Sequence, residues 1–460
     1  MCRIRSFRIL RYKNRVFPAM IPKKTATNQM PLFSLFRDTL DQNAPLYVLA
    51  EKIDWKRFED AFLPLYCQDN GRPAKPIRRM VGLLILKYLR NRSDELVVEE
   101  WKENVYFQYF CGEQSLQVCP PCTASELVHF RNRIGEKGME LILQESIRVN
   151  GDDSNDKHVC VDTTVQEKNI TYPTDQKLHR KIIDKCVKMA EEAGVALRQT
   201  YPRVLKKLRD DQRFRNHPLN KKRAKKADKK VKTIAGRLVR ELERKLPENS
   251  VYKSELDLFT KVLAQKRNSK DKIYSLHEQE VCCIAKGKEH KKYEFGNKAS
   301  IVRTTTGVIV GALSFRNEYD GHTLPEALEQ VKRLTGQEPE TATVDRGYAG
   351  IKQYGQTEVI KPERLKKGSS WRAIKKYKER LRKRVAIEPT IGHLKQDHRV
   401  GRNFLKGIKG DMMNIMLAAA AYNFKRAMRR HSSFILPQLE WIYFCISNLL
   451  KQLFGWKLAF

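Results

Sequence analysis

Two short apolar runs, each ending in an aspartate, constrain the fold of this chain most strongly. His158-Val-Cys-Val-Asp162 and Thr341-Ala-Thr-Val-Asp345 have the length and the residue types of buried β-strands. In open α/β sheets, the carboxyl ends of the strands form the edge at which ligands bind. We therefore expect Asp162 and Asp345 at one edge of a mixed sheet, where both carboxylates can serve one functional site.

The residues around the second run predict more β-structure and a helix. Ala299–Thr305 and Val308–Phe315 flank a Thr-Gly turn and form a predicted β-hairpin. Thr323 with Glu326 has the spacing of a capping box at the start of a helix, and Glu358–Lys361 is a third short strand. The order strand, hairpin, helix, strand, strand, helix predicts an α/β domain with a mixed sheet.

Residues 31–150 predict an all-helical N-terminal domain. Apolar residues recur every three to four positions through Pro76–Asn91 and through Ser93–Phe110, and we interpret each stretch as one helix. Thr123 and Glu126 form a further capping box in front of an apolar stripe. A compact helical unit of this kind docks on DNA in helix-turn-helix fashion or mediates dimerisation, and both interpretations stay open.

Basic residues dominate the charge of the chain. It has 90 Lys and Arg against 53 Asp and Glu, which gives a formal net charge of +37. Such an excess favours a polyanionic partner, most simply nucleic acid, over a basic protein without one. Residues 201–250 carry 18 Lys or Arg against 6 acids, and residues 361–410 carry 17 against 4. Arg131 and Arg133, beside the apolar stripe of the last N-terminal helix, are further candidate DNA contacts.

The changes in pattern divide the chain into four parts. Residues 1–30 are a basic N-terminal extension, 31–150 the helical domain, 151–430 the α/β domain and 431–460 an apolar tail suited to packing or self-association. Within the α/β domain, residues 175–290 form a long, basic, helical insertion. No apolar run has the length of a transmembrane helix, and the ten cysteines suggest a reducing compartment without a disulfide framework. We expect a cytoplasmic, nucleoid-associated protein with no membrane partner.

A third acid, Glu388, lies in a basic segment after the last strand. On a helix at about 100° per residue, Arg384, Glu388 and Lys395 fall within about 40° of one another. An acid flanked by cations on one face suits a metal site that also holds phosphates. Pro389 inside a helix costs about 3 kcal/mol. We therefore expect a new helix to start there, with Glu388 at its N-terminus. The alignment of Glu388 with Arg384 is then approximate.

These segments resemble a known family. Asp162-Thr-Thr, Asp345-Arg-Gly-Tyr and the spacing Arg384-x3-Glu388-x6-Lys395 resemble the DDE transposases of bacterial insertion sequences, most closely the insertion-sequence-five group of the insertion-sequence-four superfamily. The superfamily has a tyrosine where this chain has Leu381, and Tyr377 lies one turn earlier. Further blocks of the chain that look like this group are residues 128–135, 166–175, 392–399 and 414–426.

The resemblance implies an RNase H-like fold in which Asp162, Asp345 and Glu388 hold two Mg²⁺ ions, with Mn²⁺ as a possible substitute. It also implies that Arg384 and Lys395 hold phosphates near the cut. The expected activity is transposition: water cleaves double-stranded DNA at the ends of the insertion sequence, and the freed 3′-hydroxyl attacks target DNA in line. A homodimer in a synaptic complex is the expected assembly.

Two alternative functions follow from the same residues. A metal nuclease would hydrolyse DNA without joining strands, and a non-catalytic DNA-binding protein would act as a repressor. His393 and His398 lie close to Glu388, and we interpret them as DNA or packing contacts rather than as metal ligands.

Overall fold

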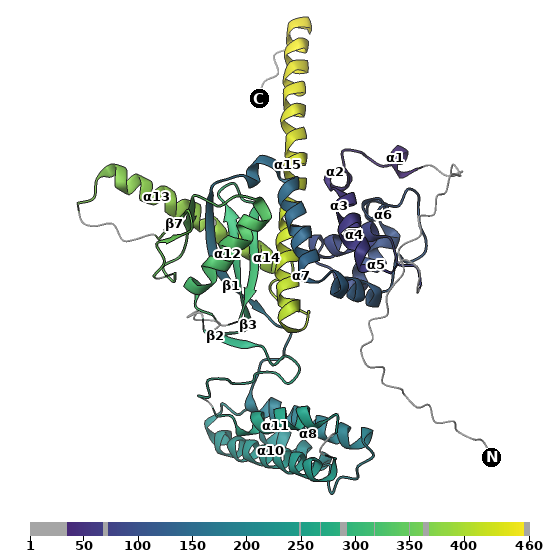
Figure 1. The fold of residues 1–460 in the computed structure, drawn as a ribbon, viewed down its shortest axis with the longest axis vertical. Coiled ribbons are helices and arrows are strands. Elements are labelled where there is room, and N and C mark those ends of the chain that lie inside the picture. The colour runs from purple at the N-terminus through teal and green to yellow at the C-terminus, as the bar shows by residue number, and fades with distance from the viewer. Residues whose placement is uncertain are drawn as a thin grey trace, which may run out of the picture.

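The computed structural model describes residues 35–67, 72–247, 250–266, 268–285, 292–316, 318–348, 350–361 and 368–454. A mixed sheet lies at the centre of this part of the chain (Figure 1). Its strands follow the order β2-β3-β1-β5-β7-β6, and β4 pairs with β3. β1 is antiparallel to β3 and parallel to β5, so both pairing directions meet at β1. The strands are β1 His158–Glu167, β2 Cys282–Ala285, β3 Tyr293–Thr304, β4 Ile309–Phe315, β5 Thr341–Thr343, β6 Gln353–Tyr354 and β7 Thr357–Ile360. The expected mixed sheet is confirmed.

β1 differs from the sequence prediction at its carboxyl end. The strand does not stop at Asp162, because its pairing with β3 continues from Val159 through Glu167. Its parallel pairing with β5, in contrast, covers only residues 158–160. Asp162 therefore lies where β1 loses one of its two neighbours. The predicted β-hairpin is confirmed as β3 and β4, and Gly307 in its turn has φ +109°, a conformation that favours glycine.

The segment 36–149 is helical, as predicted. The stretch Ser93–Phe110 forms two helices rather than one, because extended Asn104 ends α5 and its side chain caps α6 by accepting from the Phe107 amide. The capping box of Thr123 and Glu126 is present. The helices are α1 Phe36–Thr39, α2 Pro45–Lys52, α3 Trp55–Phe62, α4 Ile77–Leu89, α5 Asp94–Glu103, α6 Val105–Phe110 and α7 Ala124–Val149.

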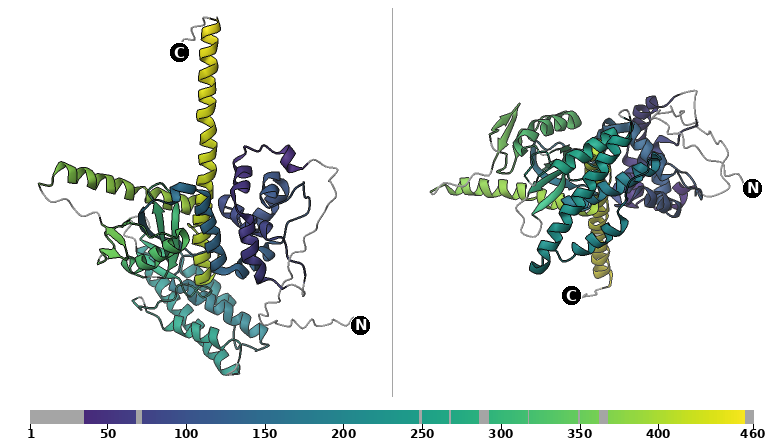
Figure 2. Two further views of the ribbon diagram at one scale, coloured as in Figure 1. Left: turned by 45° about the horizontal axis from the view of Figure 1, so that its top comes forward. Right: turned by 90° about the horizontal axis from the view of Figure 1, so that it is seen from below.

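The long helix α15 (Gly407–Phe454) joins these N-terminal helices to the sheet. Figures 1 and 2 show its first half running between α7 and the sheet, while its later half extends away from the body. Asn414 on this helix accepts from the Tyr88 hydroxyl and donates to the side chain of Gln166, so one amide connects α4, α15 and β1. One continuous apolar core follows from this arrangement. The packing of the apolar tail 431–460 lies outside the described side chains, and residues 1–30 lie outside the described residues.

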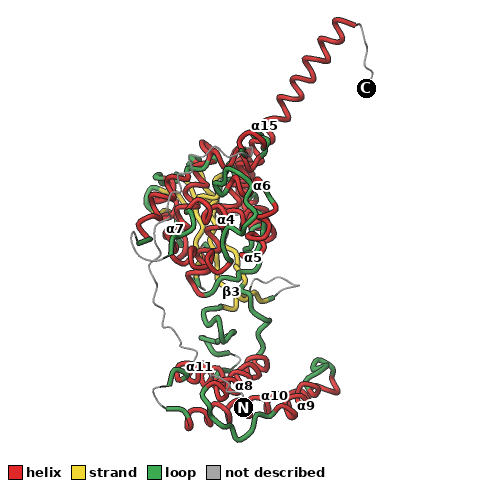
Figure 3. Tube along the Cα trace, turned by 90° about the vertical axis from the view of Figure 1, so that its right-hand side faces the viewer, coloured by secondary structure: helices red, strands yellow, loops and turns green. Residues whose placement is uncertain are grey.

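Four helices between β1 and β2 build a second core of their own. They are α8 Asp175–Glu192, α9 Pro202–Asp211, α10 Pro218–Lys245 and α11 Lys253–Ala264. Figure 3 shows this group set apart from the main body, below the sheet. Buried ion pairs connect the segment after α11 to the end of β1 and to α15. Lys168 Nζ lies 3.2 Å from Glu278 and 2.8 Å from Asp411 of α15.

The remaining helices are α12 Asp320–Thr335, α13 Trp371–Val385 and α14 Ile387–Asp397. The predicted capping box of Thr323 and Glu326 is wrong, because α12 already begins at Asp320 and the Thr323 hydroxyl donates back to the Asp320 carbonyl. Within the described residues, no helix has both the length and the apolar character needed to cross a membrane. All described cysteines are free thiols, as expected.

Candidate active site

The register of the parallel pair β1–β5 brings the two aspartates to one place. Val159 pairs with Ala342 and Cys160 with Thr343. Two residues further along both strands, this register leads to Asp162 and Asp345. Asp345 lies in the turn directly after β5, where its carboxylate accepts from the Arg346 amide at 2.5 Å. Asp162 therefore lies inside β1, just past its last pair with β5, whereas Asp345 lies beyond the end of β5.

Tyr348 anchors this turn beside Asp162. Its side chain is 1% exposed, and its amide donates to the Asp345 carbonyl at 3.2 Å. Burial raises the pKa of the Tyr348 hydroxyl, and the negative charge of Asp162 raises it further. The tyrosine therefore stays neutral and packs the Asp345 turn against β1. Its role had no signal in the sequence beyond its place in the Asp-Arg-Gly-Tyr segment.

A helix break presents Glu388. α13 ends at Val385, Ala386 forms a turn, and α14 starts at Ile387. Pro389 is then the third residue of α14, where its missing amide hydrogen costs nothing because first-turn amides have no partner within the helix. Glu388 in this first turn is also favoured by the helix dipole. A restart of the helix was expected at Pro389; the new helix begins two residues earlier, at Ile387, so Glu388 is its second residue.

Arg384 lies between two of the three acids. One terminal nitrogen of its guanidinium is 3.6 Å from a carboxylate oxygen of Asp345, and the other is 3.6 Å from Glu388. The arginine side chain is 19% exposed, whereas the Asp345 and Glu388 side chains are 51% and 60% exposed. One largely buried cation thus holds two solvent-accessible carboxylates on either side of it.

The acids do not converge on a single point. In the part of the chain that the structure describes, no three His, Cys, Asp or Glu side chains form a group able to hold a metal ion. Asp345 and Glu388 pair with Arg384 instead. The donors are nevertheless carboxylate oxygens, the kind that Mg²⁺ prefers. Because Asp345 and Glu388 are exposed, both side chains can turn away from Arg384 without disturbing the core.

The predicted DNA contacts have different surroundings. Lys395 lies on α14 at 25% exposure and 4.0 Å from Glu294. The Arg133 guanidinium stacks over the Tyr66 ring at 4.5 Å. The prediction that Arg131 contacts DNA is wrong, because Arg131 is 4% exposed and its guanidinium donates to both oxygens of Asp94. Its place on α7 turns it inward, so it stabilises the helical core and offers no surface to DNA.

A group of cations that the sequence prediction did not single out lies beside α14. Arg303 on β3 and Lys425, Arg426 and Arg429 on α15 surround one pocket. The run Lys425-Arg426-x-x-Arg429 is visible in the sequence. Its meeting with Arg303, more than a hundred residues away, depends on the tertiary fold.

Comparisons with known proteins found two transposase domains and one relative. Residues 34–133 match the family model described as a transposase domain (DUF772), and residues 265–424 match the model described as the transposase DDE domain. The chain is 42% identical over 182 residues to the uncharacterized protein ORF8 in the nfe locus of Rhizobium meliloti, which covers 38% of this chain and 87% of that protein. No solved structure matches the chain significantly.

Proposed function

The chain belongs to the DDE transposase family and is a DDE-type DNA transposase, and from this premise we propose how it acts. It binds the ends of its insertion sequence, cleaves the DNA there and joins the freed 3′ ends to target DNA. The observation that carries the proposal is the Arg384 bridge between Asp345 and Glu388, together with the register that leads Asp162 to Asp345. These two relationships support a common site for the three acids and Arg384.

Asp162, Asp345 and Glu388 are the proposed metal ligands. Enzymes of this family use divalent metal ions, and we propose two Mg²⁺ ions, with Mn²⁺ able to substitute. Such ions supply the activation of the attacking oxygen and neutralise charge at phosphorus when they are bound. The fit rests on the all-oxygen donor set and on the exposure of Asp345 and Glu388.

The cations of the chain bind and orient the DNA. Once Glu388 and Asp345 turn away from Arg384, its planar guanidinium is available for two oxygens of one phosphate. Lys395 is seven residues after Glu388, two helical turns along the same side of α14. Arg384 and Lys395 therefore flank Glu388 and hold the strand in line for attack.

Three finer points belong to the same proposal. The parallel pairing of β1 with β5, with the antiparallel β3 on the other side of β1, supports an RNase H-like sheet. The boundaries 31–150, 151–430 and the insertion 175–290 remain our proposed domains, and the separate core of α8–α11 supports the insertion as a unit. Two copies of the chain are proposed to pair the two element ends.

The test is a joining reaction with purified protein. A duplex that carries an element end is incubated with a supercoiled target and Mg²⁺, and joined and nicked products are separated on a gel. Wild-type protein should give joined product, and Asp162→Asn, Asp345→Asn and Glu388→Gln should each abolish it. Glu340→Gln is the control, because Glu340 is an exposed acid at the opposite end of β5.

Other outcomes would select an alternative function. Nicks without joined product would identify a nuclease. Tight binding with a steep salt dependence but no cleavage would identify a repressor. Unchanged joining by Asp162→Asn or Glu388→Gln would refute the metal assignment.

A further inference from the structure

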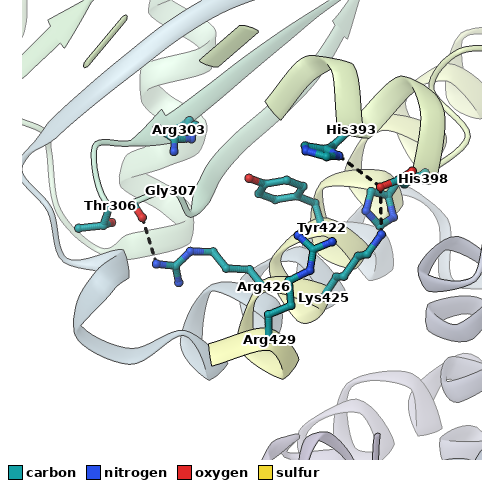
Figure 4. A pocket seen from close by; sticks show the side chains of 10 residues that line it. Arg303, Thr306, Gly307, His393, His398, Tyr422, Lys425, Arg426 and Arg429 are labelled. Atoms are coloured by element: carbon teal, nitrogen blue, oxygen red, sulfur yellow. Dashed lines mark hydrogen bonds and ion pairs between the residues drawn. The ribbon is translucent and has the colours of Figure 1, made fainter. Parts of the chain in front are cut away.

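A small basic pocket lies beside α14, between the β3–β4 turn and α15 (Figure 4). Its cavity volume is about 140 Å³. Pockets for whole cofactors or drug-sized molecules usually have about 300–1,000 Å³, so this cavity suits a single small group. The residues that line it are Arg303, Thr306, Gly307, His393, Asp397, His398, Tyr422, Lys425, Arg426 and Arg429.

The lining has an excess of positive charge. Four of its side chains are Lys or Arg, and one, Asp397, is an acid. Lys425 pairs with Asp397 at 2.9 Å, and Arg426 pairs at 2.5 Å with Asp153, which lies outside the lining. Arg303 has no carboxylate partner within the described residues, and its buried Nε has no hydrogen-bond partner there. Arg303 thus brings to this pocket a positive charge that no carboxylate of the described residues compensates.

Gly307 lets two of these cations approach each other. A Cβ at this position would lie 3.1 Å from a terminal nitrogen of Arg303 and 3.3 Å from Nε of Arg426. Two guanidinium groups therefore reach the same turn residue from β3 and from α15. Like charges this close repel, and an anion between them would offset that repulsion.

His398 supplies a second, independent sign of a ligand. The residue is fully buried, and its Nδ1 lies 3.0 Å from the Tyr88 carbonyl, so Nδ1 carries the proton and donates. Burial lowers the pKa of His398 to about 4, so the ring is neutral and Nε2 is an acceptor. Within the described residues, Nε2 is buried without a hydrogen-bond partner, although a buried acceptor normally has one.

The pocket lies on the flank of α14 opposite Glu388. His393 and Asp397, which line it, are four residues apart and share one side of the helix. Asp397 is nine residues after Glu388, which at about 100° per residue is half a turn away. Lys395, by contrast, lies on the Glu388 side. A strand whose reacting phosphate is at Glu388 therefore does not pass through this pocket on its direct course.

We propose that the pocket binds a backbone phosphate of a second DNA segment, one that runs along the flank of α14 opposite the reacting strand. The proposed contacts to this phosphate are Arg303, which is half-buried, and Arg429, which is exposed. The choice of DNA as the source of the phosphate rests on the proposed function. A transposase acts on two DNA segments, the element end and the target, so the proposed reaction includes a second strand that can bind here.

The test measures DNA affinity by fluorescence anisotropy in EDTA, where no cleavage occurs, at several salt concentrations. Arg303→Gln and Arg429→Gln are each expected to weaken binding about tenfold, equally for element-end and arbitrary duplexes, and to lower the salt slope by about 1. Lys332→Gln is the charge-matched control, because Lys332 is exposed on α12 and pairs with Glu338. It should change affinity less than twofold. Melting curves check that each variant is folded. If Arg303→Gln does not fold, Arg429→Gln still tests the proposal.

Two arms separate the possible outcomes. Isothermal titration with inorganic phosphate tests for a free-anion site: phosphate binding that Arg303→Gln removes, with unchanged DNA affinity, would overturn the proposal. The second arm first saturates the protein with an unlabelled element-end duplex and then adds a labelled arbitrary duplex. The labelled duplex should still bind, and Arg429→Gln should weaken this second binding far more than Arg384→Gln does. Equal effects of the two substitutions on both duplexes would place both residues on one strand and refute the second segment. Absence of DNA binding by the wild-type chain would count against the proposed function itself.

Discussion

Arg384 lies between Asp345 and Glu388, with a guanidinium nitrogen 3.6 Å from a carboxylate oxygen of each. The arginine therefore supplies the positive charge that keeps two acids close together without metal or DNA. When a phosphate binds to the same guanidinium, Asp345 and Glu388 lose Arg384 as their partner and become available to the proposed metal ions. Binding of DNA and release of the two carboxylates are thus linked through one side chain.

Replacing Arg384 by Gln should separate activity from stability. We expect strand joining to fall roughly 10²-fold, because a charged donor beside a reacting group commonly contributes about that much. The melting temperature should hardly change, since partners that are 51% and 60% exposed make ion pairs of at most about 1 kcal/mol. Arg384→Lys should not restore joining, because an ammonium cannot reach both partners in a fork. Arg382→Gln, at an exposed neighbouring position, is the control, and an equal loss there would contradict a specific role.

The buried Lys168 should matter for stability. Its side chain is 1% exposed and forms ion pairs with both Glu278 and Asp411. Lys168→Met leaves these two carboxylates without their cation, so we expect a loss of about 3–5 kcal/mol in the free energy of unfolding. Urea unfolding followed by circular dichroism measures it. Lys157→Met breaks the exposed pair with Glu340 and should cost less than about 1 kcal/mol. Equal losses in the free energy of unfolding of the two variants would show that the buried ion pairs stabilise the protein no more than the exposed pair does.

Arg131 should contribute to folding rather than to DNA binding. Arg131→Gln leaves Asp94 with Lys87 as its remaining ion-pair partner in a largely buried site. We expect a destabilisation of about 2–4 kcal/mol by thermal unfolding, with the DNA affinity of the folded protein unchanged within twofold. Arg133→Gln on the same helix is the comparison. A tenfold loss of affinity with no loss of stability in Arg131→Gln would restore Arg131 as a DNA contact.

His398 should make the protein less stable in acid. Burial lowers the pKa of His398 to about 4 in the folded state, below the value of 6.5 for a free side chain. The neutral ring therefore contributes stability that is fully present above about pH 6.5 and is lost as the pH falls toward 4. The loss amounts to roughly 3 kcal/mol. His398→Gln, which can still donate to the Tyr88 carbonyl, should show a flatter stability profile between pH 4 and 7. Parallel profiles for the two proteins would contradict a buried neutral histidine.

Local patterns were sufficient for several elements. Apolar alternation and the Thr-Gly turn predicted the hairpin that became β3 and β4. The spacing of Thr123 and Glu126 predicted a cap because both hydrogen bonds involve residues three apart. The same reasoning failed for Thr323 and Glu326, since nothing in the spacing showed that α12 starts one turn earlier. The extension of β1 past Asp162 was also missed, because it depends on pairing with β3, which is far away in sequence.

The sequence by itself determined the acids, the cations near them and the family, because residue type and spacing are local properties. Strand length and helix period also indicated the ends of elements near Asp345 and Glu388, whereas Asp162 lies inside β1. Only the tertiary structure decided which charges meet. It turned Arg131 inward to Asp94, set Arg384 between two acids and brought Arg303 to α15. The physical reason is that an ion pair or a pocket depends on distance in space, and contacts between distant segments follow from the packing of the core.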